Sequence, residues 1–159
     1  MVGRFLCGIG ALIWNPADNK YLVLRRAAAK DFAAGEWESV AGRVDQGESF
    51  EAALHREVRE EISTTVSIEA ILKTEHFYRG EARPENELLL VHYLCAITDP
   101  AQVVIGEEHS EYRWLTVSEI EALLPIGHWL LSVIQLAEAI RALMPSELRD
   151  VYRDLMQHH

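Results

Sequence analysis

The sequence predicts an α/β fold in which helices cover both faces of a mixed β-sheet. Strand-like apolar runs come first, one helix is inserted among them, and further helices follow after about residue 116. No linker, repeat or block of charge divides the chain, and 159 residues is a usual length for one domain. We therefore expect a single domain over 1–159, with C-terminal helices at about 126–156 packed on it.

The first predicted strand is the apolar run from Phe5 to Trp14. Turn-forming residues from Asn15 to Asn19 separate it from a second apolar run, Tyr21 to Leu24, so we expect a hairpin of buried strands. Small residues without a period predict a surface loop from Ala27 to Gly35. A short strand from Trp37 to Ala41 is expected to follow this loop.

A helix is predicted from about Ser49 to Ile62. Ser49 has the side chain of an N-cap, and apolar residues recur behind it at helical spacing. This apolar stripe consists of Phe50, Leu54, Val58 and Ile62. The β-branched residues from Thr64 to Val66 favour a strand, so the helix should end abruptly.

Three further strands are expected after this helix. They cover about Val66 to Tyr78, Glu87 to Ile97 and Glu111 to Leu115. A polar loop that contains Gly80 and Pro84 joins the first two of them.

The remainder of the chain has helical patterns. Thr116 to Glu119 opens a short helix, and apolar residues recur at helical spacing from Trp129 to Ile140. After Pro145, Ser146 can cap a last amphipathic helix. The apolar face of that helix consists of Leu148, Val151, Tyr152 and Leu155.

The charge of the chain restricts its partners. With 25 acidic and 15 basic residues the formal net charge is −10, which repels nucleic-acid backbones and anionic lipid surfaces. We therefore expect no generic nucleic-acid binding and no membrane partner. If the ligand is an anion, a divalent cation can bridge it to the acidic protein.

The cysteines and the N-terminus favour a cytoplasmic location. Cys7 and Cys95 each lie in an apolar, strand-like run, which is typical of buried thiols in a reducing compartment. No run approaches the ~20 apolar residues of a membrane span. The segment from Met1 to Trp14 lacks a basic cluster and a small-residue cleavage site. His158 and His159, whether native or the remainder of a tag, are assigned no function.

Three glutamates lie on one side of the helix predicted after Ser49. At ~100° per residue, Glu57, Glu60 and Glu61 project together, and Glu61 lies at the margin of the apolar stripe. Like charges at this spacing repel one another, whereas Mg²⁺ accepts carboxylate oxygens while it keeps waters and phosphate oxygens. The alternative is a solvated acidic face paired with Arg56 and Arg59.

The segment from Gly42 to Glu61 resembles the signature of the Nudix hydrolases. That signature reads Gly, five residues, Glu, seven residues, Arg-Glu-aliphatic-any-Glu-Glu-any-Gly-aliphatic. The positions that match it are Gly42, Glu48, Arg56, Glu57, Val58, Glu60 and Glu61. Ser63 and Thr64 depart from it, and a serine in place of glycine costs ~1 kcal/mol at a left-handed helix end or implies a different exit.

The resemblance extends over about Phe5 to Ile140 and implies a Nudix-type α/β/α sandwich with a mixed β-sheet and C-terminal helices. It also implies metal ligands for Mg²⁺ or Mn²⁺. These are Glu57, Glu60 and Glu61, with the backbone carbonyl of Ala41. The resemblance pairs Glu48 with Arg56 to brace the loop against the helix.

The resemblance implies further site residues, each with a competing residue or a competing role. A further metal-binding carboxylate is expected before the last strand, at Glu108, with Glu107 and Glu111 as competitors. Arg25 or Arg26 is expected to bind phosphate, and only one of them can face the site because neighbouring strand residues point to opposite faces. Trp37 could stack on a nucleobase, although strand aromatics are more often core.

The function implied is metal-dependent hydrolysis of a pyrophosphate bond by water attack on phosphorus. The expected substrate is a nucleoside triphosphate or another nucleoside diphosphate derivative, because the acidic chain disfavours long polyanions. The alternatives are a non-catalytic Nudix-fold nucleotide sensor, or a Nudix hydrolase of ADP-ribose, dinucleoside polyphosphates or RNA 5′ ends. The helix that carries Trp129 could support a homodimer, although its apolar residues are most simply core.

Overall fold

The computed structural model describes residues 3–29 and 33–156, so the predictions for His158 and His159 lie outside the described residues. Within these ranges seven strands form one sheet, and four α-helices surround it. The strands are β1 (Leu6–Asn15), β2 (Lys20–Arg26), β3 (Trp37–Glu38), β4 (Val40–Arg43), β5 (Val66–Tyr78), β6 (Glu87–Ile97) and β7 (His109–Leu115). The helices are α1 (Phe50–Ile62), α2 (Val117–Leu123), α3 (Trp129–Leu143) and α4 (Ser146–Met156). Two short 3₁₀ turns are η1 (Pro84–Asn86) and η2 (Pro100–Gln102).

The sheet is mixed, as predicted. Its main path is β3-β2-β1-β6-β5, with β4 on β1 and β7 on β2. Strands β1 and β6 are parallel over most of their length, and the other pairs are antiparallel. Side chains on both faces of this sheet are buried, which is the condition for covering helices on each side.

Strands β1 and β2 pair as the predicted hairpin only next to its turn. The two strands pair at Trp14 with Tyr21 and at Asn15 with Lys20. Farther along, β4 pairs with the same edge of β1, while β2 turns away to pair with β3 and β7. For the same reason the single strand predicted from Trp37 to Ala41 is divided at Ser39, because β3 pairs with β2 and β4 with β1.

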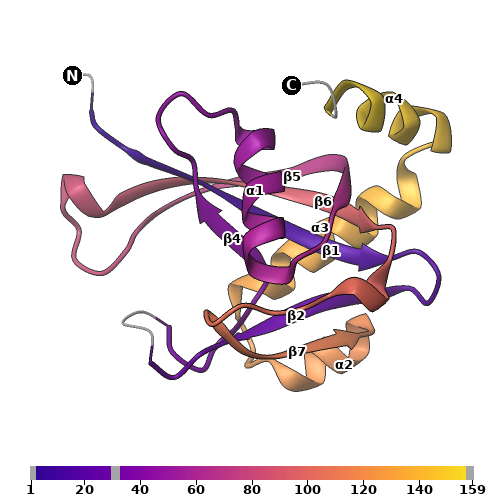
Figure 1. The fold of residues 1–159 in the computed structure, drawn as a ribbon, viewed down its shortest axis with the longest axis horizontal. Helices are drawn as coiled ribbons and strands as arrows, with labels where there is room; N and C mark the ends of the chain where they lie inside the picture. Colours follow the sequence, from indigo (N-terminus) through magenta and orange to yellow (C-terminus); the bar gives the residue numbers. More distant parts are fainter. Residues whose placement is uncertain (1–2, 30–32, 157–159) are drawn as a thin grey trace.

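Two apolar cores lie on the two faces of the sheet. One contains Leu54, Val58 and Ile62 of α1, which are fully buried as the predicted stripe requires. The other contains Leu130 and Val133 of α3 on the opposite face. Figure 1 shows α1 in front of the strands and α3 behind them. The predicted sandwich of helix, sheet and helix is therefore confirmed.

The last helix differs from its prediction. Ser146 is the first residue of α4 and not its N-cap, and its hydroxyl donates to the Glu147 carboxylate at 3.2 Å. The predicted apolar face is largely exposed, at 45% for Leu148, 51% for Val151 and 65% for Leu155. A helix of amphipathic pattern needs a facing surface. None of the residues of this face belongs to either core, and α4 instead contacts the first core through Met156.

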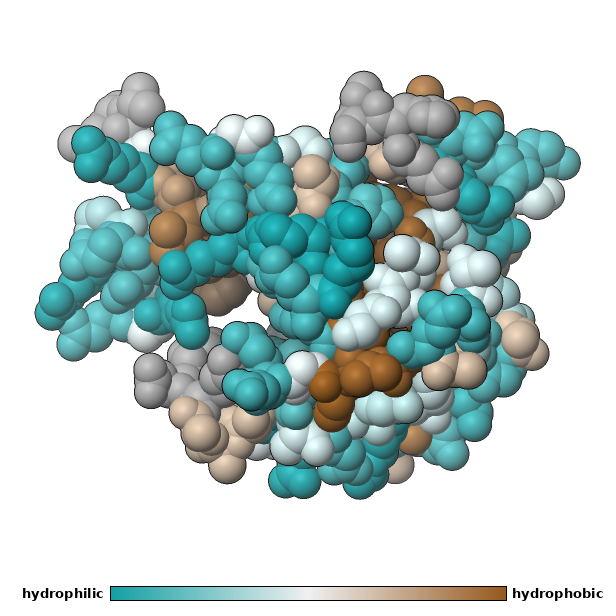
Figure 2. Space-filling view, in the orientation of Figure 1, coloured by the Kyte–Doolittle hydropathy of each residue, from teal (hydrophilic) through white to brown (hydrophobic). Residues whose placement is uncertain are grey.

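Several surface properties follow from this arrangement. Hydrophilic side chains cover most of the face that carries α1 (Figure 2), in keeping with the high charge of the chain. Among the described helices, none combines the length and the apolar character needed to cross a membrane. Both cysteines are free thiols, and Cys95 is buried as expected, whereas Cys7 is partly exposed.

Candidate active site

Helix α1 carries the acidic residues, and both of its ends are defined. Ser49 Oγ accepts a hydrogen bond of 3.1 Å from the backbone amide of Ala52, as predicted for an N-cap. At the other end Ser63 is left-handed, with φ 54° and ψ 28°, and its amide donates to the Arg59 carbonyl at 3.1 Å. The departure of Ser63 from the signature is therefore local backbone strain and not a different exit.

Gly42 in β4 lies directly against the Glu57 side chain of α1. A Cβ atom built on Gly42 would stand 1.9 Å from Glu57 Cδ and 2.1 Å from Oε1. A Cβ atom there would force the Glu57 side chain to move, so glycine lets this carboxylate keep its place, although the φ of Gly42 is ordinary. This contact places β4 next to α1 where the helix carries the Glu57 carboxylate.

Arg56 ties the loop before α1 to the helix. Its Nε and Nη2 donate to the two carboxylate oxygens of Glu48 at 3.0 Å each, in a bidentate pair. Nη2 also donates to the Arg43 carbonyl at 2.8 Å, and Nη1 donates to Glu57 Oε1 at 2.7 Å. Hydrogen bonds from Arg56 and from the Asp45 amide hold the pKa of Glu48 below its usual range.

Glu61 is the most perturbed carboxylate of the molecule's described part. Glu61 is only 6% exposed. Its carboxylate oxygen Oε2 is buried and has no hydrogen-bond partner among the described residues. Burial raises the pKa of Glu61 to about 9, and the nearby charges of Glu38, Glu57 and Glu108 push it in the same direction. A hydrogen bond with the Ala41 backbone opposes this rise. Several negative charges are thus gathered around one buried oxygen.

The other two glutamates of α1 differ in their surroundings. Burial raises the pKa of Glu57, although its hydrogen bond from Arg56 opposes this effect. The charges of Glu60 and Glu108 raise it further. Glu60 is exposed and makes a longer contact with Arg56, at 3.4 Å. The three carboxylates therefore form a gradient from buried to solvent-exposed along one side of α1.

Glu108 reaches this cluster from the loop between η2 and β7. The loop is fixed to the end of α1 by two backbone hydrogen bonds, from Val104 to Ile62 at 3.1 Å and from Gly106 to Glu61 at 3.0 Å. The charge of Glu108 acts on two carboxylates of α1. Its competitor Glu111 instead pairs with arginines of the sheet, at 3.7 Å from Arg25 and 2.6 Å from Arg113.

The two predicted phosphate-binding arginines point to opposite faces, as expected. Arg26 donates to Glu38 at 3.0 Å, on the face that also carries Leu24 and the α1 core. Arg25 lies on the other face with its register partner Trp37, its guanidinium carbon 5.9 Å from the ring centroid. The structure thus places Arg26 beside the carboxylates, and it does not bring Arg25 or Trp37 to them.

Trp37 lies among arginines at the margin of the second core. Arg113 covers its ring at 4.9 Å, and the side chain packs against the residues between the sheet and α3. Cation–π contacts of this kind stabilise a partly exposed ring. A nucleobase would reach Trp37 only from the face of the sheet opposite α1.

Two residues of the cluster, Glu38 and His109, are not predicted by any sequence pattern. His109 Nε2 lies 2.9 Å from Glu38 Oε1 and 3.9 Å from Glu61 Oε2, and its side chain is fully buried. Glu38 and His109 are 71 positions apart, so no local pattern links them. They meet because β3 and β7 both pair with β2. The one available signal is that His109 directly follows Glu108 in the sequence.

The cluster fits a hard divalent cation by its chemistry, although it is not a ready cage. Within 3–29 and 33–156 no three acidic, histidine or cysteine side chains already converge to hold a metal. Glu57 is bonded to Arg56, and Glu60 points to solvent. The donors are nevertheless carboxylate oxygens, which Mg²⁺ and Mn²⁺ prefer, and Glu61 Oε2 accepts no hydrogen bond from the part of the chain that the structure describes.

Comparison with known families agrees with this geometry. A family model described as the NUDIX domain matches residues 5–136. Nucleoside triphosphatase NudI from Escherichia coli O139:H28 is 26% identical over 111 residues, which cover 65% of this chain and 77% of that protein.

Solved structures share the fold. The MutT protein from Methanosarcina mazei Go1 superposes with a TM-score of 0.71 at 22% identity, covering 87% of this chain and 97% of that one. An Ap4A hydrolase from C. elegans, solved as a binary complex, has a TM-score of 0.69 at 21% identity, covering 86% and 98%. At these identities the likeness concerns the arrangement of strands and helices.

Proposed function

Because this chain belongs to the Nudix hydrolase family and is a Nudix pyrophosphohydrolase, we propose that it hydrolyses nucleoside triphosphates with Mg²⁺ or Mn²⁺. The family acts on pyrophosphate bonds of nucleotide derivatives. In the proposed reaction, water attacks phosphorus and the products are a nucleoside monophosphate and pyrophosphate. The cysteines, both free thiols, support a reducing, cytoplasmic location.

The buried carboxylate of Glu61 is the observation that carries this proposal. Its unpartnered oxygen lies among the negative charges of Glu38, Glu57 and Glu108. Such a cluster is unfavourable by itself and becomes favourable when a cation joins it. A purely structural role would not explain why four carboxylates gather where a single salt bridge would suffice.

The proposed metal ligands are carboxylates and one carbonyl. They are Glu57, Glu60, Glu61 and Glu108, with the backbone oxygen of Ala41. When bound, a divalent cation supplies positive charge to the phosphate oxygens and makes the attacking water more acidic.

The remaining roles belong to groups of the chain itself. Arg56 and Glu48 hold the loop of Gly42 and Arg43 against α1, so that the carboxylates keep their places. Arg26 lies on the carboxylate face and can bind a phosphate oxygen in exchange with Glu38. His109 contacts Glu38 and Glu61 and positions both.

Two observations support a triphosphate over larger substrates. The net charge of −10 opposes a long polyanion such as RNA, and the relative NudI is a nucleoside triphosphatase. The retained carboxylates oppose a purely sensing role. The competing substrates are ADP-ribose, dinucleoside polyphosphates and RNA 5′ ends.

A substrate panel tests the proposal. We would measure kcat/KM with Mg²⁺ and then Mn²⁺ for canonical and oxidised dNTPs, a pterin triphosphate, ADP-ribose, a diadenosine polyphosphate and a triphosphorylated RNA. A triphosphate should lead by about tenfold or more, equivalent to ~1.4 kcal/mol of transition-state binding. A lead for ADP-ribose, the diadenosine compound or RNA would contradict the substrate class, and inactivity on every compound would contradict the hydrolase.

A further inference from the structure

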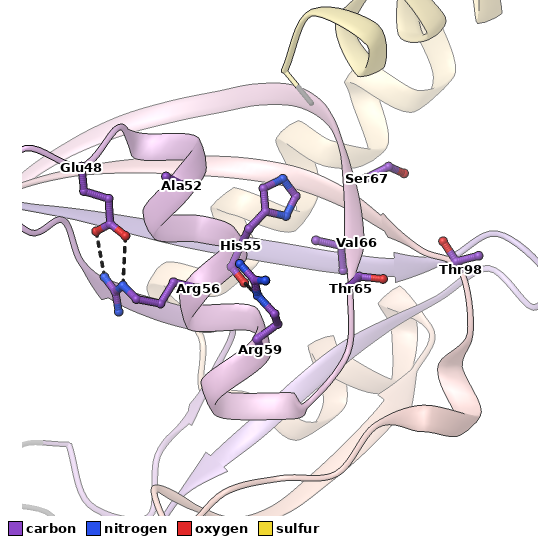
Figure 3. Close-up of a pocket in the computed structure, with 9 residues that line it drawn as sticks. All are labelled: Glu48, Ala52, His55, Arg56, Arg59, Thr65, Val66, Ser67 and Thr98. Carbon is purple, nitrogen blue, oxygen red and sulfur yellow. Dashed lines mark hydrogen bonds and ion pairs between the residues drawn. The ribbon is translucent and has the colours of Figure 1, made fainter. Parts of the chain in front are cut away.

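An apolar groove lies at the corner between α3 and α4. It has a volume of about 300 Å³ and is lined by apolar side chains from the last two turns of α3, the turn that follows and the start of α4. Among them are Leu136, Leu143 and Leu148. A larger groove of about 790 Å³ along α1 is a different case, because the Glu48–Arg56 ion pair of the proposed active site lines it (Figure 3). The groove at the corner has no part in that site.

Exposed apolar side chains extend from this groove along both helices. On α3, Leu136 is 39% exposed and Leu143 is 82% exposed. On α4, Leu148, Val151 and Leu155 recur at helical spacing on one face, and about half or more of each residue is exposed. We call these five residues the α3–α4 patch. The patch is continuous, because Leu148 belongs both to the groove and to the apolar face of α4.

The α3–α4 patch lies far from the carboxylate cluster in the order of the sheet. Helix α4 lies beside β5, where Arg153 donates to Glu69 at 3.3 Å. Strand β5 is one end of the main path of the sheet, and β3, which carries Glu38, is the other end. At the start of α3, Trp129 packs against the second core, so the open part of this helix is its C-terminal end. A partner bound to the patch would therefore leave the proposed active site accessible.

The size of the patch matches one side of a dimer interface. The exposed fractions of its members amount to nearly three complete side chains, or roughly 450 Å² of apolar surface. A standard interface covers about 800 Å² on each partner, of which roughly 60% is apolar. The patch therefore supplies about the apolar area that one partner contributes to a stable dimer.

Charge argues against a lipid surface as the occupant. Helix α4 has three acidic residues and two arginines, and the whole chain has a net charge of −10. Helices that lie on membranes instead carry lysines and arginines on their polar face, which attract anionic lipid. A second copy of the chain fits better, because its own patch offers an apolar surface of the same size.

We propose that the α3–α4 patch is the interface of a two-fold homodimer held together by apolar contacts. In such a dimer the same patch of both copies meets. Leu143, the most exposed member, stands beside the groove, so Leu143 of each copy can enter the groove of the other. The interface does not depend on the proposed hydrolase function, because it uses no residue of that site.

The net charge gives this dimer a distinctive dependence on salt. Two copies of net charge −10 repel each other at long range, and added salt screens this repulsion. Apolar contacts are not weakened by NaCl in this way. The association should therefore become stronger as NaCl is raised, whereas a contact held by ion pairs would become weaker.

Sedimentation velocity of the full chain measures the association. At about 150 mM NaCl the parent should be mainly dimeric at about 100 μM, within the range of affinities of standard-size interfaces. Leu143→Arg and Leu148→Arg should each weaken the association at least about tenfold, because each places an unpaired charge in the interface. Both positions are exposed in one copy, so circular dichroism should show an unchanged fold.

Ile126→Arg is the matched control, because Ile126 is a fully exposed apolar residue in the loop before α3, at the other end of that helix. This variant gains the same charge and should associate within about twofold of the parent. A parent that is monomeric at about 100 μM, or that associates less as NaCl rises from about 50 to about 500 mM, would overturn the interface. So would association of Leu143→Arg equal to that of the parent. Binding of a monomeric parent to phosphatidylcholine vesicles, lost in Leu143→Arg, would instead make lipid the occupant and overturn the dimer.

Discussion

Gly42 and Glu57 are in such close contact that a single added Cβ atom on the glycine would stand 1.9 Å from Glu57 Cδ. The contact joins β4 to α1 and limits where the Glu57 side chain can lie between them. The glycine at the start of the signature thus leaves room for the Glu57 side chain in its present position. It is not a requirement of backbone conformation, because its φ is not in the left-handed region.

Gly42→Ala should displace the Glu57 side chain. We expect a loss of about 1–3 kcal/mol in the free energy of unfolding, as for other overpacked sites, and a fall in turnover of about tenfold or more. Denaturant unfolding and steady-state kinetics measure the two effects. In a Glu57→Ala background the same glycine substitution should cost little, because the clashing atoms are gone. An equal cost in both backgrounds would show that the contact with Glu57 is not the cause.

Glu60→Gln and Glu61→Gln should each lower turnover by about a hundredfold or more, as expected when a main electrostatic contributor is lost. The fold should remain intact, which circular dichroism can verify. Glu121→Gln on α2 makes the same chemical change at an exposed position and serves as the matched control. Turnover of the α1 variants within about threefold of the parent at saturating Mg²⁺ would remove these residues from the metal site.

The stability of the metal-free protein should fall as pH rises from about 5 to about 9 because of Glu61. The pKa of Glu61 in the folded chain is about 9, whereas a glutamate in the unfolded chain titrates near its ordinary value. Between these values the folded chain binds one more proton than the unfolded chain, so each rise in pH favours unfolding.

Glu61→Gln removes this dependence. In EDTA, the free energy of unfolding of this variant should exceed that of the parent. The difference should grow with pH and reach ~1 kcal/mol or more at pH 8. Urea unfolding at several pH values measures the difference. Adding Mg²⁺ should stabilise the parent more than the variant. A difference that does not change with pH would mean that Glu61 is ionised in the folded chain throughout this range.

Ser63→Gly should stabilise the protein by up to about 1 kcal/mol, since glycine adopts the left-handed conformation of the helix end without the cost of a Cβ atom. Turnover should be unchanged. Ala52→Gly, inside the same helix, should have the opposite sign, because a helical glycine costs ~1 kcal/mol. A lower Tm for Ser63→Gly would indicate that the serine side chain makes a favourable contact at this end.

The sequence alone determines the features that depend on neighbours within a few residues. The N-cap Ser49, the stripe through Leu54 and Val58, and the spacing of the glutamates on α1 follow from the geometry of one helix. Strands β5 and β6 begin and end where their apolar patterns predict. The signature of α1 and its loop is likewise a local pattern, which is why the family and the proposed metal ligands can be inferred from the order of residues in that one segment.

Tertiary structure decides which of these segments meet. No periodicity shows that β2 leaves β1 to pair with β3 and β7, yet this pairing brings His109 to Glu38 and Glu61 and turns Arg26 toward them. Burial of Glu61 and exposure of the α4 face also depend on what packs against each residue. The physical reason is that alternation and helical spacing record which side of a segment is buried, whereas the partner that buries it is chosen by strand pairing across distant parts of the chain.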